Sequence, residues 1–424
     1  MDWARAYDPM APETRARAHE IYAELRRECP VHHHRMPAEE QARQARNPRL
    51  SGTTAEFWSV LRHEDCVRVL QSPEDFSNRQ GPGPERRAPV GDGMLLTADD
   101  PAHRRQRRIA GKGFLPRVVR AQEAVVRATV DDLIDALAPR GRAELMADLA
   151  VPLTVTMITA LFGAGADRRD DVASWGRAII GANGGDQAAV DASAVALAEL
   201  FGYIGGLVAT RRADPAPADD VLTALVTARD EDGAFTDDEI CLAAMQFLSA
   251  GYETTATAIG NAVVLLCTHP GQRAALEADW SLLDQAVEEI LRVESPVEGT
   301  FRTAREAVEV GGVSVPADGK VRVVFASANR DEQRFAEPRA FRIDRPITEL
   351  RRHLAFGHGP HACLGSALAR AELRIALRTV LTRLPGLALD PRRPPQRSDS
   401  MTVNGWATVP VVWPAARSRP RGTE

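Results

Sequence analysis

Apolar residues recur with helical spacing through the middle of the chain. The longest such run lies between Thr236 and Cys267, where Ile240 and Phe247 follow the helical period and most faces are apolar. Thr236 and Glu239 have the spacing of a capping box, which marks the start of a helix. The pattern therefore predicts a long helix that passes through the centre of the protein.

β-Branched runs lie towards both ends of the chain. The sequence FWSVLRHEDCVRVL starts as a strand and continues as a helix, and VEVGGVSV reads as two strands around a Gly-Gly turn. VPVVW, near the C-terminus, predicts a last short strand. Because strands at both ends flank a helical middle without βαβ alternation, we expect a mainly α fold with small β regions, classed as α+β.

We find no internal repeat and no linker between two independent cores, so residues 1–424 are expected to form a single domain. The polar segment 36–55 is expected to be an exposed insertion. The tail 414–424, rich in arginine and proline, is expected to be disordered.

Composition narrows the class of protein. The net charge of −5 argues against nucleic acid as the main partner. The N-terminus lacks a basic stretch followed by an apolar one, and no run of about 18 apolar residues is present, so we expect a cytoplasmic protein without a membrane span. The five cysteines are scattered without C-x-x-C spacing, which argues against disulfides and a cysteine-rich zinc site.

The central helix is interrupted at Ala250-Gly251-Tyr252-Glu253-Thr254-Thr255. A glycine inside a helix costs about 1 kcal/mol, and threonines are poor helix formers. The Thr254 hydroxyl can bond the carbonyl of Ala250 and open the helix locally. The segment is either a packing notch for a crossing helix or a groove beside a buried reaction centre, where an acid and an alcohol move protons.

Three further polar features have an ordinary explanation when each is taken alone. Glu289 and Arg292 lie three residues apart on one helix face, as surface ion pairs often do. His103 and Arg107 share one face of a basic helix. Arg302 precedes an expected strand and resembles many surface arginines.

Cys363 lies in the glycine-rich stretch LAFGHGPHACLG, directly before the helical sequence SALARAELRIALRTVL. A zinc site lacks partner ligands at workable spacing. A nucleophilic cysteine stays open, because His361 is two residues away and could act as a base. An iron ligand fits better, since glycines permit close approach of a flat ring and a helix start favours thiolate.

The stretch Phe356–Gly365 closely resembles the F-G-x-G-x-H-x-C-x-G signature of the cytochrome P450 family. Four weaker matches accompany it in the family's order: LLTADDPAHRRQRR, AGYETT, EILR and FRTAREAVEVGGVSVPADGKV. The resemblance covers residues 10 to 413. It implies a triangular prism of helices that holds haem b between the central helix and the helix after the cysteine loop.

The resemblance also implies roles for individual residues. Cys363 would be the axial thiolate to the haem iron, and Phe356 would shield its sulfur. Thr254 and Glu253 would deliver protons to bound dioxygen in a groove at Ala250 and Gly251. The haem propionates would be bound by His103, Arg107, Arg302 and His361.

Two details of the resemblance are incomplete. Glu289 and Arg292 would form a structural pair with a third basic partner, for which Arg339, Arg342 and Arg345 all compete. Tyr252 replaces a residue that is often histidine in bacterial members, and we expect little effect of this change on oxygen chemistry.

The function implied is a haem-thiolate monooxygenase that uses O2 and two electrons to hydroxylate a small organic substrate in bacterial secondary metabolism. Oxidative coupling or ring formation without oxygen insertion is the alternative, and a haem sensor without turnover is a third possibility. Electrons would come from NAD(P)H through a separate ferredoxin and reductase to a monomeric enzyme. A basic docking patch would include Arg104, Arg105, Arg108 and Lys112.

Substrate contacts are expected from Arg79–Leu96, the IIGANGGDQ turn, the start of the central helix, Val297–Phe301 and Asn404–Trp406. The individual lining candidates are Leu95, Phe247, Val297, Glu298 and Trp406. Glu298 is unusual for an apolar wall: either it binds a basic or hydrogen-bond-donating substrate group, or its side chain turns away from the pocket.

Overall fold

The computed structural model describes residues 7–414 apart from 10–13, 15–16, 37–53, 85–92, 164–167, 169, 173, 176–177, 179–186, 215–219, 232 and 399–402. The expected insertion and tail, the IIGANGGDQ turn and part of the Arg79–Leu96 segment fall largely outside the described residues.

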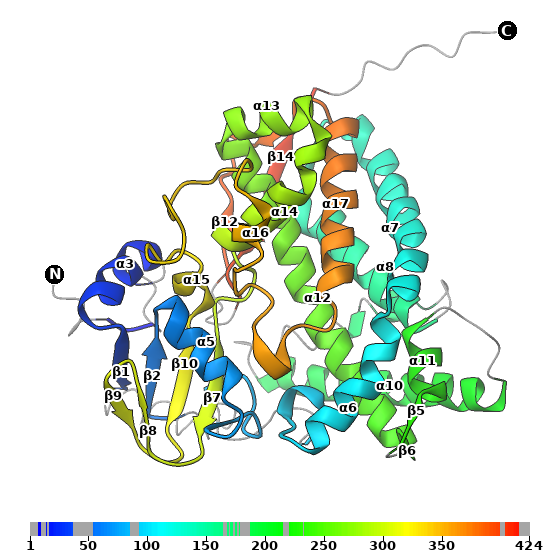
Figure 1. Cartoon of the computed structure of the whole chain (residues 1–424). Helices are drawn as coiled ribbons and strands as arrows, with labels where there is room; N and C mark the ends of the chain where they lie inside the picture. The colour runs from blue at the N-terminus through cyan, green and yellow to red at the C-terminus, as the bar shows by residue number, and fades with distance from the viewer. Residues whose placement is uncertain are drawn as a thin grey trace, which may run out of the picture.

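Helices dominate the structure (Figure 1), as the apolar periodicity predicts. The longer helices in the described part of the chain are α3 (Ala18–Glu28), α5 (His63–Gln71), α6 (Ala102–Ala110), α7 (Pro116–Leu137), α8 (Val151–Leu161), α10 (Gln187–Ala213), α11 (Val221–Thr227), α12 (Asp237–Thr268), α13 (Pro270–Ala278), α14 (Leu283–Val293) and α17 (Ser366–Arg383). The single-turn helices α15 (Phe325–Ala328) and α16 (Ile347–Leu350) lie between α14 and α17 in sequence.

Small sheets make up the β part, and the main one has five strands in the order β1-β2-β10-β7-β3 among the described residues. β2 and β10 are parallel, and the other pairs in this sheet are antiparallel. The strands of this sheet are β1 (Val31–Arg35), β2 (Glu56–Val60), β3 (Phe76–Ser77), β7 (Thr300–Ala304) and β10 (Lys320–Val323).

The remaining strands of the described chain form a three-stranded sheet, in the order β11-β14-β4, and three two-stranded ribbons. The Gly311-Gly312 hairpin of β8 and β9 is confirmed, and both glycines have positive φ, as a tight two-residue turn requires. These strands are β4 (Arg142–Glu144), β5 (Arg229–Asp230), β6 (Gly233–Ala234), β8 (Val308–Val310), β9 (Val313–Val315), β11 (Ala388–Leu389), β12 (Gln396–Arg397), β13 (Trp406–Thr408) and β14 (Pro410–Val412).

The long central helix is confirmed as α12, which passes through the middle of the molecule (Figure 1). The capping box is present: the Thr236 hydroxyl accepts from the Glu239 amide at 3.2 Å, and the Glu239 carboxylate accepts from the Thr236 amide at 2.8 Å. One side of α12 packs in a core cluster with α7, α8, α14 and α17, and another side packs with α8, α10 and α11. α12 is apolar on most faces because it is enclosed by helices on most sides.

One segment of the described chain, Asp191–Ala213 in α10, is long and apolar enough to cross a membrane when judged by length and composition only. Its mean hydropathy is 1.6, and 28% of the tested window is buried. A single segment of this kind is weak support for a span, because core helices of other proteins pass the same test. The absence of a membrane span therefore stays a prediction.

Candidate active site

The loop that carries Cys363 is shaped by its glycines. Gly357 and Gly359 have φ angles of +68° and +71°, which side chains with a Cβ rarely adopt. A Cβ on Gly359 would also lie 2.5 Å from the carbonyl oxygen of Leu70. The Cys363 amide donates to the Phe356 carbonyl at 2.8 Å and closes the loop. The glycine-rich sequence therefore holds Cys363 just ahead of α17.

Burial holds the pKa of the Cys363 thiol above its ordinary value. Desolvation raises its pKa, whereas a hydrogen bond from the Gly365 amide and the charges of Arg107 and Arg370 lower it. Cys363 is exposed, while the other four cysteines are buried or half-buried. The charges of Arg107 and Arg370 therefore offset part of the effect of burial, in the direction that favours the thiolate form.

Four basic side chains from three separate segments converge near this loop. The imidazoles of His103 and His361 stack with centroids 3.7 Å apart and planes 18° apart. The pKa of His361 falls to about 2, because burial and the neighbouring His103, Arg302 and Arg107 all oppose a further positive charge. Burial also lowers the pKa of Arg302 to about 10. Such a cluster suits a ligand with two carboxylates, which is what a haem offers.

The sequence interruption in α12 supplies the other polar group of the site. Ala250 is exposed and Gly251 to Thr254 are partly exposed, although residues 243–246 before them and 255–266 after them are buried. The predicted bond from Thr254 Oγ1 to the Ala250 carbonyl is confirmed at 2.7 Å. Burial raises the pKa of the Glu253 carboxyl. An accessible alcohol and a weakly acidic carboxyl thus lie next to each other on the central helix.

A side-chain hydrogen bond connects α12 to α17 next to this segment. Thr255 hydrogen-bonds the buried Glu372 of α17, and burial raises the pKa of Glu372 to about 8. The Glu372 carboxyl is therefore mostly protonated at neutral pH. Glu372 is not predictable from the sequence, because its partner lies on another helix and no local spacing marks the pair.

The Glu289–Arg292 pair is not a surface ion pair. Both side chains are fully buried, with Arg292 Nε 2.7 Å from a Glu289 carboxylate oxygen. Arg292 also donates to the carbonyls of Pro338 and Ala340. The third basic partner is Arg345, whose Nε lies 3.1 Å from Glu289 Oε1 and whose side chain is buried. The pair therefore anchors the segment that leads to the cysteine loop.

The other two candidates for that third position have different surroundings. Arg342 is half-exposed and binds Glu289 only through its backbone amide, at 2.8 Å, while its guanidinium pairs with Glu337 and Asp344. Arg339 is exposed. Its side chain has no hydrogen bond or ion pair among the described residues.

Two of the substrate-lining candidates are brought together by a residue that the sequence did not single out. Gln246, next to Phe247 on α12, donates to the Met94 carbonyl at 2.8 Å and accepts from the Leu96 amide at 3.2 Å. These bonds tie the segment around Leu95 to the same helical turn as Phe247. Val297 bridges to Val403, and the Asn404 amide donates to the Pro296 carbonyl at 2.9 Å, so the two predicted segments lie side by side. Trp406 packs against the core, with the Arg397 guanidinium carbon 4.0 Å from its ring centroid.

Glu298 has internal partners. Its carboxylate accepts from the Tyr22 hydroxyl and lies 3.2 Å from Arg322 Nη2, which makes the side chain part of a buried cluster under the five-stranded sheet. Since the carboxylate is already engaged, the structure matches the alternative in which Glu298 turns away from substrate. The hypothesis that it binds a basic substrate group is not supported.

The expected basic patch on α6 is partly neutralised. Arg104 pairs with Asp100 at 2.8 Å and Arg105 pairs with Glu239 at 2.9 Å. Lys112 donates to the Arg229 carbonyl. Arg104 is 76% exposed against 25% for Arg105, and Arg108 is exposed as well.

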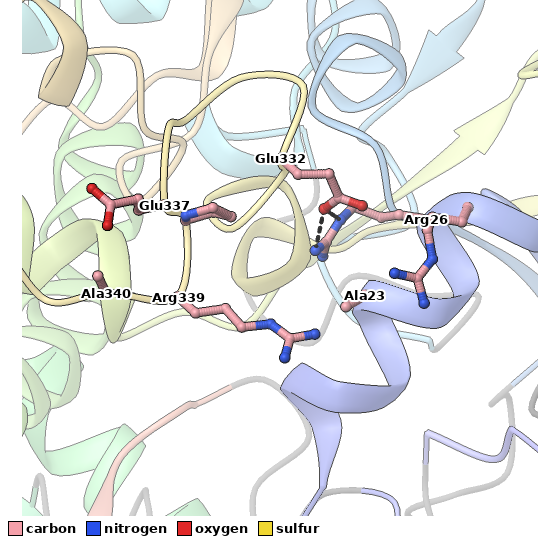
Figure 2. A pocket seen from close by; sticks show the side chains of 8 residues that line it. Ala23, Arg26, Glu332, Glu337, Arg339 and Ala340 are labelled. Carbon is pink, nitrogen blue, oxygen red and sulfur yellow. Dashed lines mark hydrogen bonds and ion pairs between the residues drawn. The ribbon is translucent and has the colours of Figure 1, made fainter.

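A separate surface pocket of about 490 Å³ lies between α3 and the segment from Glu332 to Ala340 (Figure 2). Figure 2 shows Arg339 reaching towards α3, and the Arg26 guanidinium bonded to Glu332. None of the lining residues was predicted to bind haem or substrate. The pocket therefore does not belong to the candidate active site.

Comparisons with known proteins identify the family of the chain. Residues 191–404 match the family model for cytochrome P450. The chain is 38% identical to cytochrome P450 monooxygenase PikC from Streptomyces venezuelae, over 95% of this chain and 92% of that protein. The chain belongs to the cytochrome P450 family. It is therefore an oxidoreductase of a family that uses haem iron and O2.

Other relatives extend the comparison. Mycinamicin IV hydroxylase/epoxidase from Micromonospora griseorubida is 35% identical over 84% of this chain and 90% of that protein. The structure of cytochrome P450 CYP109Q5 from Chondromyces apiculatus superposes with a TM-score of 0.82 at 32% identity, covering 97% of this chain and 98% of that chain. The mainly α P450 fold expected from the sequence is thus confirmed.

Proposed function

We propose that this P450 inserts one oxygen atom of O2 into a small organic substrate, with the balance R–H + O2 + 2 e⁻ + 2 H⁺ → R–OH + H2O. The observation that carries the proposal is the convergence of His103, Arg107, Arg302 and His361 beside the accessible Cys363 thiol. These groups fit haem b, because the basic side chains suit its two carboxylates and the thiol offers an iron ligand.

Each part of the site has a role in this proposal. Cys363 would hold the iron as thiolate, and Phe356, whose carbonyl accepts from the Cys363 amide, would shield the sulfur. When bound, the haem supplies the activation of dioxygen, and a thiolate ligand favours cleavage of the O–O bond. Thr254 and Glu253 would hold and transfer the two protons beside Ala250 and Gly251.

The raised pKa of Glu253 supports its part in proton delivery. A carboxyl that keeps its proton nearer to neutral pH can donate it and recover it from solvent. Thr254 donates its own hydroxyl proton to the Ala250 carbonyl, so the lone pairs of Oγ1 remain available. Oγ1 can thus accept a hydrogen bond from a proton-donating group in the site.

The proposal also covers the source of the electrons, the oligomeric state and the location of the enzyme. Electrons would come from NAD(P)H through a separate ferredoxin and its reductase, with Arg104 and its neighbours on α6 meeting the ferredoxin. The enzyme would act as a single-domain monomer in the cytoplasm. Its relatives include hydroxylases of bacterial secondary metabolism, which supports a secondary metabolite as substrate.

Two experiments test the proposal. The reduced protein with CO should show the thiolate-type absorption band, and Cys363→Ser should lose that band while keeping its fold. Wild-type protein that is folded and loaded with haem but lacks the band would refute ligation by Cys363. A metabolite library should then contain compounds that shift the haem spin state, and product mass should show a gain of one oxygen; a loss of two hydrogens would indicate coupling instead.

A further inference from the structure

A charged triad lies directly behind the cysteine loop. The Glu288 carboxylate, on α14, accepts from Arg370 of α17 through both of its oxygens, one of them at 3.0 Å from Arg370 Nη2. Glu288 Oε2 also lies 2.9 Å from His353 Nε2. The three residues come from three segments and are separated by up to 82 positions in the sequence, so no local motif predicts them.

The triad contacts the ring of Phe356. The Arg370 guanidinium carbon lies 4.3 Å from the ring centroid, which is within cation–π distance. The His353 ring lies near the same phenyl ring, with centroids 6.0 Å apart. The Phe356 carbonyl in turn accepts from the Cys363 amide at 2.8 Å. The guanidinium is therefore connected to the cysteine loop through one aromatic residue.

Hydrogen bonds orient the members of the triad. The Ala355 amide donates to His353 Nδ1 at 3.2 Å, so His353 carries its proton on Nε2 and donates it to Glu288. Although burial raises the pKa of Glu288, the bonds from His353 and Arg370 lower it to about 2. The triad therefore places the Glu288 carboxylate between the Arg370 guanidinium and the Nε2–H group of His353.

Burial distinguishes this triad from ordinary surface pairing on the same helix. The side chains of His353 and Glu288 are 1% and 5% exposed. One turn further along α17, Arg374 pairs with Asp284 at 3.1 Å, but these side chains are 37% and 65% exposed. Arg370 is 27% exposed, so the two pairs differ mainly in their carboxylates: buried Glu288 is costly unless it is well paired, whereas exposed Asp284 is not.

We propose that Arg370, held by Glu288 and His353, is a positioning residue that fixes the Phe356 ring behind Cys363 and places a positive charge there, and thereby sets the stability of the thiolate ligand and the reduction potential of the iron. This inference rests on the proposed haem ligation by Cys363. It adds a role for residues that the family resemblance left unassigned in this chain.

The test compares Arg370→Gln with Arg370→Lys, and uses Arg374→Gln as the matched control. In Arg370→Gln, the thiolate-type CO band should decay about fivefold faster, the effect of losing an interaction of roughly 1 kcal/mol. The midpoint potential should become more negative, because losing a nearby positive charge favours ferric iron. Arg370→Lys should restore the potential, since it keeps the charge, and Arg374→Gln should match wild type in both measurements.

A double-mutant cycle tests whether Phe356 transmits the effect on ligand stability. In a Phe356→Leu background, Arg370→Gln should change the decay of the band by less than about twofold. Two results would overturn the inference: Arg370→Gln behaving as Arg374→Gln does, or Arg370→Lys showing the same potential as Arg370→Gln. A wild-type protein without the thiolate-type band would instead overturn the proposed function, so the two failures are distinguishable.

Discussion

At the scale of single residues, Thr254 combines a defined hydrogen bond in α12 with a proposed role in proton delivery. Its hydroxyl bonds the Ala250 carbonyl at 2.7 Å in the accessible part of α12. If Thr254 helps to deliver protons, Thr254→Ala should lower the amount of product formed per NAD(P)H consumed by about tenfold to a hundredfold. Substrate binding, measured by the spin-state shift, should change little. Thr254→Ser should retain most of the coupling because it keeps the hydroxyl.

Thr268 provides the control for this residue. It makes the same kind of bond to the Val264 carbonyl, at 2.8 Å, near the C-terminal end of α12. Thr268→Ala removes a comparable hydrogen bond away from the site, so it should leave the coupling of electrons to product unchanged. Equal uncoupling in both alanine variants would show that helix geometry, and not proton delivery, accounts for the effect.

At the scale of elements, the contact between α12 and α17 predicts a pH dependence of stability. Glu372 has a pKa of about 8 in the folded protein, against an ordinary value of 4.5 for a glutamate in water. Between these values the folded state binds more protons than the unfolded state, so stability falls as pH rises. The slope from this buried group is up to about 1.4 kcal/mol per pH unit.

Chemical denaturation between about pH 5 and pH 8 measures that slope. This range lies between the pKa values of Glu372 in the unfolded and the folded protein. Glu372→Gln removes the titrating group but keeps a polar side chain beside Thr255. The free energy of unfolding of this variant should therefore depend less steeply on pH than that of the wild type. Parallel curves for the two proteins would contradict a raised pKa for Glu372.

The segment from Ala336 to Arg345 yields a second prediction at this scale. Arg345 binds Glu289 and the carbonyls of Ala336 and Glu337, and its side chain is buried. Arg345→Ala leaves the Glu289 carboxylate with one fewer buried partner, so it should cost about 3 kcal/mol of unfolding free energy or more.

Arg339→Ala and Arg342→Ala are the matched controls, because both remove an exposed or half-exposed arginine from the same segment. Each should change stability by about 1 kcal/mol or less in the same denaturation assay. If Arg342→Ala proved as costly as Arg345→Ala, the assignment of the third basic partner to Arg345 would be wrong.

At the scale of the whole molecule, local features were predictable and distant ones were not. The start of α12 follows from Thr236 and Glu239, and the hairpin follows from two glycines, because both are set by residues a few positions apart. The bond between Tyr22 and Glu298 joins positions 276 apart. Periodicity carries no information on such a contact, so the choice between two orientations of Glu298 needed the structure.

The candidate site likewise contains residues that the sequence predicts and residues that it does not. The motif around Cys363 and the family resemblance named the basic residues in advance, and the structure brings His103 and His361 into stacking contact. The residues that hold this site in place, such as Arg345 and Glu372, depend on helix packing between distant segments. The family resemblance therefore predicts which residues form the site, whereas only the tertiary contacts show which residues hold them in place.

The last prediction concerns how the whole molecule meets its electron donor. If an acidic ferredoxin docks on α6, the rate of the first electron transfer should fall as ionic strength rises, because salt screens attraction between surface charges beyond about 10 Å at 0.1 M. Arg104→Gln should lower the second-order rate several-fold at low salt. Arg105→Gln should lower it less, since both arginines pair with a carboxylate but the Arg105 side chain is only 25% exposed, against 76% for Arg104. Stopped-flow reduction under CO measures these rates, with Arg120→Gln on α7 as the control. A rate independent of salt, or an equal loss in Arg120→Gln, would place the docking surface elsewhere.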